Sequence, residues 1–242
     1  MKCCWLAALI LLTCAWAAAA PGLRVGFGTN KPPYVFEATQ SGLEVDIVAA
    51  ASRLAGFEIK PTFAPMERLH VMYAAGQLDA IATTNPQAGE KGFFSQPYVT
   101  YHNMAAALTA RRYTIRSIAD LAGYSVSAFQ RAHVLLGPAF RRMAEENPSY
   151  REEAQQVVRN LLLLSGRVDV IVGDRRIINY FMRDIPAQVD IRQAITWYEI
   201  FPATEYQMVF RNQEQRDRFD TGLAAMRKRG DYQLVEKKYQ DF

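Results

Sequence analysis

Two short apolar runs of the sequence are each followed by polar residues that could contact a small solute. Residues 83–85, which are Thr, Thr and Asn, follow the run 80–82, and Asp174 follows the similar run 170–172. The hydroxyl and amide groups can supply polar contacts to a ligand, and the carboxylate can bind a cation. Asp174 also opens a predicted helix, so its carboxylate could instead cap that helix by accepting from its own backbone.

A third polar group, residues 130–133, follows the predicted strand 125–129 and opens another helix. Free backbone N–H groups at the start of a helix bind anions. Arg131 and His133 could reinforce such a site. They could equally be surface residues, since an unperturbed imidazole is mostly neutral at pH 7.

Catalytic patterns are missing from the sequence. The three histidines (His70, His102 and His133) lack the spacing of metal ligands, and there is no nucleophile elbow, phosphate-binding glycine loop or dinucleotide fingerprint. Single carboxylates such as Glu67 or Asp174 could act as an acid or a base, but nothing pairs them. We therefore expect a protein that is not an enzyme and that uses no metal and no cofactor.

The two apolar runs belong to a repeated unit. Residues 75–79 (Ala-Gly-Gln-Leu-Asp) lead into the first run, and residues 165–169 (Ser-Gly-Arg-Val-Asp) lead into the second. Each copy follows a helical apolar pattern, and its Gly stands where a helix C-cap tolerates a left-handed residue. Short apolar runs are typical of strands buried in a parallel sheet, although a buried helix fits the same pattern. Two copies of one αβ unit predict two similar lobes.

The first half of the chain alternates between predicted strands and helices, which favours a parallel sheet covered by helices. The expected strands are 23–27, 58–63 and 80–82, and the expected helices are 46–54 and 67–75. Ligands of such sheets lie beyond the carboxyl ends of the strands. The loops after Phe27 and Ala82 should therefore face the site.

The second half is expected to form the other lobe and then to return to the first. Its predicted elements are helices at 117–121, 132–145, 150–164 and 174–182, strands at 125–129, 189–195 and 206–210, and helices at 214–229 and 232–239. Two strands would then cross between the lobes, near 105–109 and 205–209, which is the geometry of a hinge. The expected division is 1–20 signal peptide, 21–108 with 204–242 lobe 1, and 109–203 lobe 2.

The first 20 residues have the composition of a secretory signal peptide. Lys2 is followed by an apolar core and by small residues before Pro21, and the core is too short to cross a bilayer. A membrane anchor is the alternative. Cys14 lies in a sequence resembling a lipoprotein box, but Thr13 stands where Gly or Ala is usual, so we expect no lipid anchor. All three cysteines lie in this leader, so we expect the exported chain to be held by its core alone.

Charge and length narrow the class of protein further. The formal net charge is +4, and the arginines are scattered in pairs among acidic residues. This distribution argues against nucleic-acid binding, which needs a clustered basic stripe. The remaining roughly 220 residues suffice for one large domain or two of ordinary size.

Several short motifs occur together along the chain. They are Gly26, Pro33-Tyr34, Gly42-Leu43-Glu44-Val45-Asp46-Ile47, Gly76-x-x-Asp79, Phe94-Ser95-x-Pro97-Tyr98, Ser117-Ile118-x-Asp120-Leu121, Gly166-x-x-Asp169 and Gly173-Asp174. In this order they resemble the extracellular solute-binding proteins of family 3, the periplasmic receptors of polar amino acid ABC importers. The resemblance covers residues 23–239. It implies an α/β, two-lobed periplasmic binding protein fold (type II, Venus flytrap) with two βαβ-rich lobes and a two-strand hinge.

The resemblance also implies how a ligand would be held. In the family, the loop after the Asp79 strand supplies polar groups and then an Arg that grips the ligand carboxylate bidentately. This loop is shorter here and lacks the Arg. Counting back from Phe94 puts Ala88 in its place, and counting forward from Asp79 puts Lys91 there, either as a point charge or as a solvated lysine. The family residue at Asp174 binds the ligand's α-ammonium.

The candidate ligand contacts combine these polar positions with the first-lobe loops. Met66 and Tyr34 could form walls of the cleft or belong to the core, since apolar residues mostly pack inside. The candidates are Lys31, Tyr34, Met66, Arg68, Thr83, Thr84, Asn85, Lys91, Arg131, His133 and Asp174.

We therefore expect a monomeric periplasmic solute-binding protein that captures an amino acid or a related organic acid for an ABC permease of the inner membrane. Without the Arg, the ligand could equally be a dicarboxylate, a peptide fragment or an aromatic acid. The alternatives are a periplasmic sensor or orphan binding module, and an enzyme resembling cyclohexadienyl dehydratase.

Overall fold

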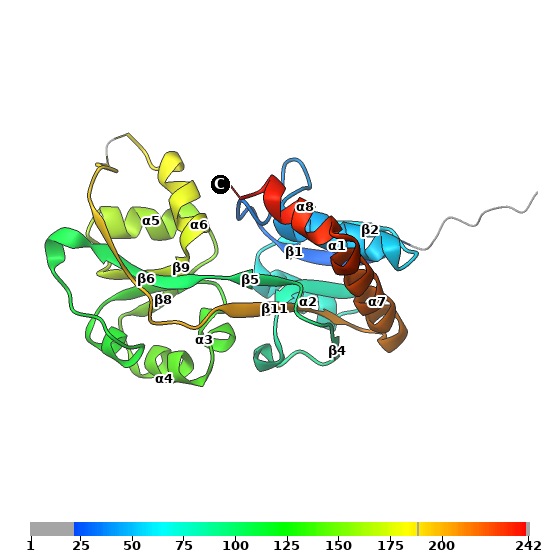
Figure 1. Cartoon of the computed structure of the whole chain (residues 1–242). Coiled ribbons are helices and arrows are strands. Elements are labelled where there is room, and N and C mark those ends of the chain that lie inside the picture. The colour runs from blue at the N-terminus through cyan, green and yellow to red at the C-terminus, as the bar shows by residue number, and fades with distance from the viewer. Residues whose placement is uncertain (1–21, 188, 241–242) are drawn as a thin grey trace, which may run out of the picture.

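The computed structural model describes residues 22–187 and 189–240. Figure 1 shows two lobes side by side, each built on a central sheet with helices packed on it. The predicted signal peptide and its cysteines lie outside the described residues. None of the helices in the described part of the chain has the length and hydropathy that crossing a membrane requires.

The first sheet has six strands and combines both ends of the chain. Its order is β2-β1-β3-β11-β4, with β5 also paired to β11. The strands are β1 (Leu23–Gly28), β2 (Ile59–Ala64), β3 (Ala80–Thr84), β4 (Phe93–Phe94), β5 (Val99–Tyr101) and β11 (Thr204–Phe210). β1 runs parallel to β2 and β3, which confirms the predicted βαβαβ unit. β11 runs antiparallel to β3, so the end of the chain does return to this lobe.

Helices cover this sheet on both sides. They are α1 (Leu43–Leu54), α2 (Met66–Ala74), α7 (Gln213–Arg229) and α8 (Asp231–Lys238). α7 lies directly on α1, and the contact depends on Gly222, because a Cβ there would collide with the carbonyl oxygen of Ala51. The absence of a side chain at Gly222 thus sets how closely the two helices approach.

The second sheet has five strands in the order β10-β6-β9-β7-β8. They are β6 (Asn103–Leu108), β7 (Val126–Phe129), β8 (Tyr150–Glu153), β9 (Val170–Asp174) and β10 (Ile195–Tyr198). Its α-helices are α3 (Ala132–Leu135), α4 (Pro138–Glu146), α5 (Gln156–Leu164) and α6 (Arg175–Tyr180). Short 3₁₀ helices are η1 (Pro86–Ala88) in the first lobe and η2 (Thr109–Arg111), η3 (Ala119–Gly123) and η4 (Phe181–Asp184) in the second.

Three predicted elements of this lobe are wrong in part. The helix expected over 150–164 begins as strand β8, which pairs parallel with β7, and becomes helical only at Gln156. The helix expected over 132–145 is two helices, α3 and α4. They are separated at Gly137, whose φ of 90° is outside the helical range, and α4 begins at Pro138. The strand expected over 189–195 instead occupies 195–198.

The chain passes between the sheets twice. The first passage is His102, between β5 of one sheet and β6 of the other, and the second is the segment 199–203 between β10 and β11. Residues 103–108, which the sequence analysis assigned to lobe 1, pair with β9 and β10 of the second sheet. We propose that the lobes divide at His102 rather than at residue 108.

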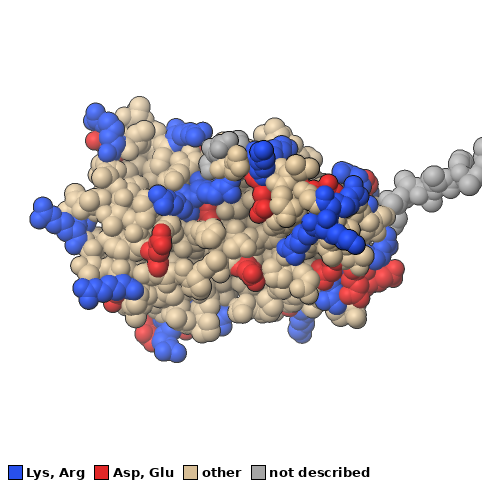
Figure 2. All heavy atoms as spheres, viewed as in Figure 1, with Lys and Arg blue, Asp and Glu red and all other residues tan. Residues whose placement is uncertain are grey.

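The lobes also pack against each other. The main apolar cluster of the first lobe includes Leu135, Ile177 and Phe181 from the second. On the face in Figure 2, Lys and Arg are dispersed among Asp and Glu without a single basic stripe. The charge distribution on this face agrees with the prediction from the sequence.

Candidate functional site

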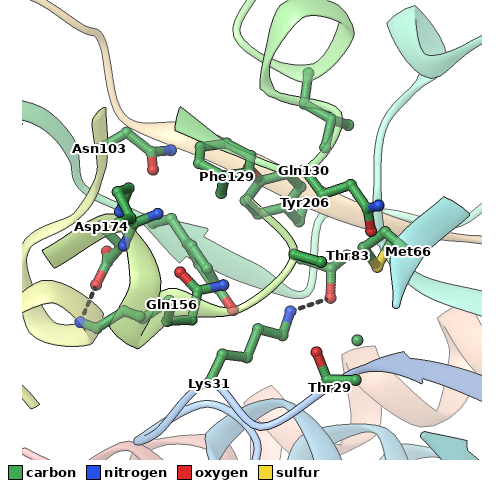
Figure 3. Close-up of a pocket in the computed structure, with 16 residues that line it drawn as sticks. Thr29, Lys31, Met66, Thr83, Asn103, Phe129, Gln130, Gln156, Asp174 and Tyr206 are labelled. Carbon is green, nitrogen blue, oxygen red and sulfur yellow. Dashed lines mark hydrogen bonds between the residues drawn. The ribbon is translucent and has the colours of Figure 1, made fainter. Parts of the chain in front are cut away.

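A cavity of about 60 Å³ lies between the two lobes, at the carboxyl ends of β1, β3, β7 and β9 (Figure 3). The first lobe contributes Lys31, Met66 and Thr83 to its lining, and the second contributes Phe129, Arg159 and Asp174. One water needs only about 10–15 Å³ by this measure, so the cavity has room for a small organic solute or a few waters. The position of the cavity is the one predicted from the strand order.

The first-lobe side of the cavity carries a buried ion pair. The Lys31 ammonium donates to Glu44 Oε1 at 2.9 Å and to Thr83 Oγ1 at 2.7 Å, and Glu44 is fully buried. Glu44 also accepts from the hydroxyls of Tyr98, at 2.6 Å, and Tyr101. Thr83 has a φ of 57°, which is rare for a β-branched residue and marks a constrained turn at the end of β3.

The contacts of Glu44 keep its carboxyl ionised. Burial pushes the pKa of Glu44 upward, but the charge of Lys31 and the hydroxyls around the carboxylate outweigh it, and the pKa lies below its ordinary value. Burial lowers the pKa of Lys31, and the Glu44 carboxylate acts in the opposite direction. The two side chains form an ion pair at 2.9 Å that is buried inside the lobe.

Asp174, at the end of β9, accepts four hydrogen bonds. Its Oδ1 accepts from the backbone N–H of Arg176 at 2.9 Å and of Ile177 at 3.3 Å. Asp174 therefore caps α6, which is one of the two roles predicted for it from the sequence. Its Oδ2 accepts from the Tyr34 hydroxyl at 3.1 Å and from the His102 N–H at 2.9 Å. Burial nevertheless raises the pKa of Asp174 above its ordinary value. Asp174 is both a cap and a cavity residue, and Tyr34 joins it to the other lobe.

Arg159 is a cavity residue that the sequence analysis missed. It lies on α5 with only 1% of its surface exposed, and its guanidinium fits behind Gly173, where a Cβ would lie 2.8 Å from Nη1. Its Nε and Nη2 find no hydrogen-bond partner within the described residues. Burial lowers its pKa to about 10, with the charges of Asp174 and Glu153 opposing. The group is therefore still cationic at neutral pH.

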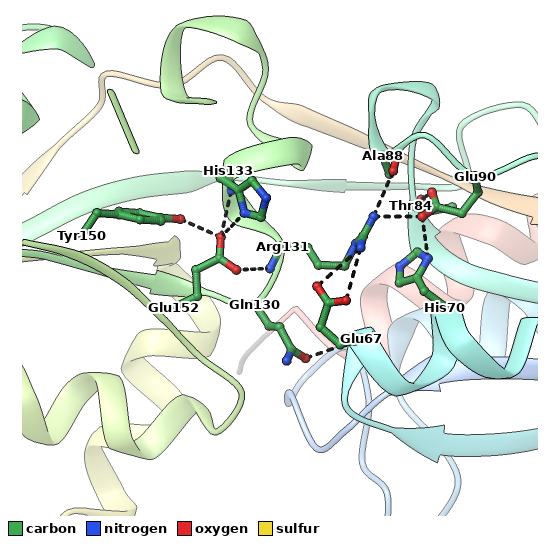
Figure 4. Close-up of polar contacts among 10 residues, drawn as sticks. All are labelled: Glu67, His70, Thr84, Ala88, Glu90, Gln130, Arg131, His133, Tyr150 and Glu152. Carbon is green, nitrogen blue, oxygen red and sulfur yellow. Dashed lines mark hydrogen bonds and ion pairs between the residues drawn. The ribbon is translucent and has the colours of Figure 1, made fainter. Parts of the chain in front are cut away.

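A separate set of polar contacts joins the lobes beside the cavity (Figure 4). Arg131 Nη2 donates to the carbonyl of Ala88 and to Glu90 Oε1, both at 2.9 Å, and its Nη1 lies 3.4 Å from Glu67. Glu90 also lies against the His70 ring, with Nδ1 2.5 Å from Oε1. We call Arg131, Glu90, Glu67 and His70 the interlobe clasp. Through it, Arg131 contacts the first lobe instead of lining the cavity.

Residues 23–242 match the family model of the bacterial extracellular solute-binding proteins, family 3. The chain belongs to this family. It is 22% identical over 250 residues to ABC transporter arginine-binding protein 1 of Escherichia coli (strain K12), with 99% of each chain covered.

Solved structures share the fold of this family 3 protein. An ancestral arginine-binding protein bound to arginine is 20% identical, with a TM-score of 0.73 over 90% of this chain and 97% of that one. A histidine kinase sensor domain with similarity to periplasmic binding proteins is 19% identical, with a TM-score of 0.74 over 91% and 96%. At these identities the likeness shows the two-lobed α/β fold.

Some of the candidates predicted from the sequence lie away from the cavity of this family 3 protein. The backbone N–H groups of Arg131 and His133 donate to Glu152 at 2.6 and 3.0 Å, so the predicted anion site at the start of α3 is filled by the chain's own carboxylate. The His133 ring also lies 2.7 Å from Glu152. Lys91 and Arg68 are exposed and do not line the cavity.

The polar run after β3 divides between the cavity and its surroundings. Thr83 lines the cavity, whereas Thr84 donates to Glu90 at 3.1 Å and Asn85 donates to the Leu135 carbonyl across the lobes at 3.1 Å. Four predicted residues therefore line the cavity: Lys31, Met66, Thr83 and Asp174. In the described part of the chain, no group of three or more His, Cys, Asp or Glu side chains is arranged to hold a metal ion.

Proposed function

We propose that this family 3 protein captures a small polar solute, an amino acid or a related organic acid, between its lobes in the periplasm and delivers it to an ABC permease. The observation that carries the proposal is the interlobe cavity, in which charged side chains from both lobes are buried together: Lys31 from one, Arg159 and Asp174 from the other. The family and the likeness to an arginine-binding protein of an ABC transporter support it.

The arrangement suits capture by closure of the lobes. A solute in the cavity contacts both lobes at once only when they are closed, so it binds the closed form better than the open one and shifts the equilibrium toward closure. His102, where the chain passes between the sheets, donates its N–H to Asp174. The hinge is thus bonded directly to a cavity residue.

A thermal-shift screen of amino acids, organic acids and short peptides tests the proposal, because a ligand of the native state raises the melting temperature. Small-angle scattering with a screened hit should show a smaller radius of gyration. Met66→Trp, which fills part of the cavity, and Phe129→Ala, which removes part of its wall, should weaken binding. Lys91→Ala, at an exposed position, should not. A hit whose affinity survives both cavity variants, or that leaves the radius unchanged, would place the site elsewhere.

A sensor role is the second candidate, favoured by the TM-score of 0.74 to a histidine kinase sensor domain. Both roles use the same closure of the lobes and differ in the partner protein that recognises the closed form. Permease and ATPase genes beside this one would therefore favour transport. We propose no enzymatic role, because each carboxylate at the cavity is already held by hydrogen bonds of the chain itself. Steady turnover of prephenate by the purified protein would overturn that.

A further inference from the structure

The carboxylates near the cavity are already engaged by groups of the chain. Glu44 holds the Lys31 ammonium and accepts from three hydroxyls. Asp174 accepts four hydrogen bonds, and an ionised carboxylate offers about four lone-pair positions. A ligand ammonium would have to displace Tyr34 or Lys31 to reach either carboxylate.

Arg159 presents the opposite situation. Its guanidinium is buried to 99% of its surface and lines the cavity, yet Nε and Nη2 have no hydrogen-bond partner among the described residues. A buried charged donor left without a partner is costly. A planar anion meets this need best, because a carboxylate can accept two hydrogen bonds from a guanidinium fork.

The rest of the lining combines apolar side chains with the amides of Asn103, Gln130 and Gln156. Among the described residues, Asn103 Oδ1 and Gln156 Oε1 find no hydrogen-bond partner. Phe129, Leu135 and Ile177 come from the second lobe, Met66 comes from the first, and Tyr206 belongs to β11. These side chains favour burial of a hydrocarbon or aromatic group. Among the described residues, the cavity thus offers the incompletely bonded cation Arg159, no uncommitted carboxylate, an apolar wall and amide groups. An amide oxygen can accept a hydrogen bond, but it is neutral and cannot balance the charge of a buried ammonium.

We propose that the ligand is a compact organic acid without an ammonium group, whose carboxylate binds Arg159 and whose apolar body packs on Phe129, Leu135 and Ile177. This inference rests on the proposed function and narrows its ligand class. Arg159 on α5 supplies the guanidinium, while Lys31 occupies the cation position beside Glu44. Arginine, which one structural relative holds, carries two cationic groups that would find no free anion here.

Matched ligand pairs test the choice of ligand by isothermal titration calorimetry at pH 7. Each pair keeps the carbon skeleton and replaces the ammonium by a carbonyl: 4-methyl-2-oxopentanoate against L-leucine, and phenylpyruvate against L-phenylalanine. At least one oxo acid should bind at least tenfold more tightly than its amino acid. Equal or tighter binding of the amino acids, or of L-arginine, overturns this inference and leaves the proposed function standing. Absence of binding by every amino acid and acid tested counts against both.

Three variants test the roles of the residues. Gly173→Ala leaves the charge of Arg159 in place but pushes its flexible end away, so it should weaken binding of the oxo acid at least tenfold, as should Arg159→Gln. Gly123→Ala, where a Cβ would have no atom within 4 Å, is the matched control and should bind like the wild type. Tyr34→Phe frees one acceptor position on Asp174 Oδ2, which still accepts from the His102 N–H, and should improve amino acid binding relative to the acid.

The folded state of each variant is checked by its melting curve. If Arg159→Gln does not fold, Gly173→Ala still tests whether Arg159 binds the ligand carboxylate. Wild-type affinity for the oxo acid in Gly173→Ala would show that Arg159 does not hold the carboxylate. An unchanged ligand preference in Tyr34→Phe would show that the bonds to Asp174 do not exclude the ammonium.

Discussion

Replacing Lys31 by Met tests the buried ion pair of the first lobe. The substitution keeps an unbranched side chain of similar length but removes the ammonium, which leaves the fully buried Glu44 without its cation. Breaking a buried ion pair by removing one partner costs about 3–5 kcal/mol. For a chain of this size, about 2–4 °C per kcal/mol gives a melting temperature lower by roughly 6–20 °C at pH 7.

The loss should depend on pH. In the wild type the pKa of Glu44 lies below its ordinary value of 4.5, so its stabilising contribution is present above pH 4.5 and is lost as the pH falls through the lowered pKa. In Lys31→Met, burial is no longer opposed by the ammonium, and the pKa of Glu44 rises. We expect burial to raise it above 4.5, so the stability of the variant falls as the pH rises from 4.5 through the raised pKa. The difference between variant and wild type should therefore grow from pH 5 to pH 7.

The assay is thermal and urea unfolding of the ligand-free protein, followed by circular dichroism. The double variant Lys31→Met with Glu44→Gln should recover most of the lost stability, because neither side chain then carries a charge. Arg53→Met is the control, since Arg53 and Glu58 form an exposed pair at 3.5 Å and its loss should be negligible. A cost below about 1 kcal/mol for Lys31→Met, or a cost independent of pH, would show that Lys31 does not stabilise the buried Glu44 carboxylate.

Three more predictions concern helix packing and the interlobe clasp. Gly222→Ala should destabilise the protein by about 2 kcal/mol or more in urea unfolding, because the new Cβ meets the backbone of α1, whereas Gly123→Ala should not. Arg131→Met should weaken ligand binding by about 10- to 150-fold in calorimetry, since the closed form loses charge-assisted bonds worth about 1.5–3 kcal/mol. Unchanged affinity would show that the clasp does not contribute to closure. Burial raises the pKa of Glu90, but contacts with His70 and Arg131 outweigh this effect and hold the pKa below its ordinary value of 4.5. The clasp should therefore persist above pH 4.5 and weaken as the pH falls through that lowered pKa. The effect of Arg131→Met on affinity should then be largest at pH 7 and should shrink below pH 4.5, as Glu90 takes up a proton.

The fold was largely predictable from the sequence because its central strands are short apolar runs with a Gly-x-x-Asp lead-in. Both runs are fully buried strands, β3 and β9, in the two sheets. The stretch 150–153 was not predictable, because its side chains are only partly buried and its pairing with β7 is a tertiary contact. Glu152 at its end also holds the start of α3, which no local pattern shows.

The site was less predictable because a charged side chain can bind any of several partners, and the sequence does not show which of them lies nearby in the fold. Arg131 and His133 stand at the right place in the sequence for an anion site, but Glu152 and the interlobe clasp hold them. Arg159 stands within a strongly apolar helix, one turn before Leu162 and Leu163, and it is buried with them. A charged residue on the apolar face of a helix was the one available indication that it serves the interior.

The order of the strands also determines which parts of the chain can fold early. Every strand of the second sheet comes from the continuous segment 103–198, so that sheet can assemble while the rest of the chain is still unfolded. The first sheet cannot, because β11 lies between β3 and β4 and is the last strand among the described residues. Contacts between such distant segments form slowly. A chain that stops before residue 204 would therefore leave β3 as an unpaired edge, which invites association with other chains.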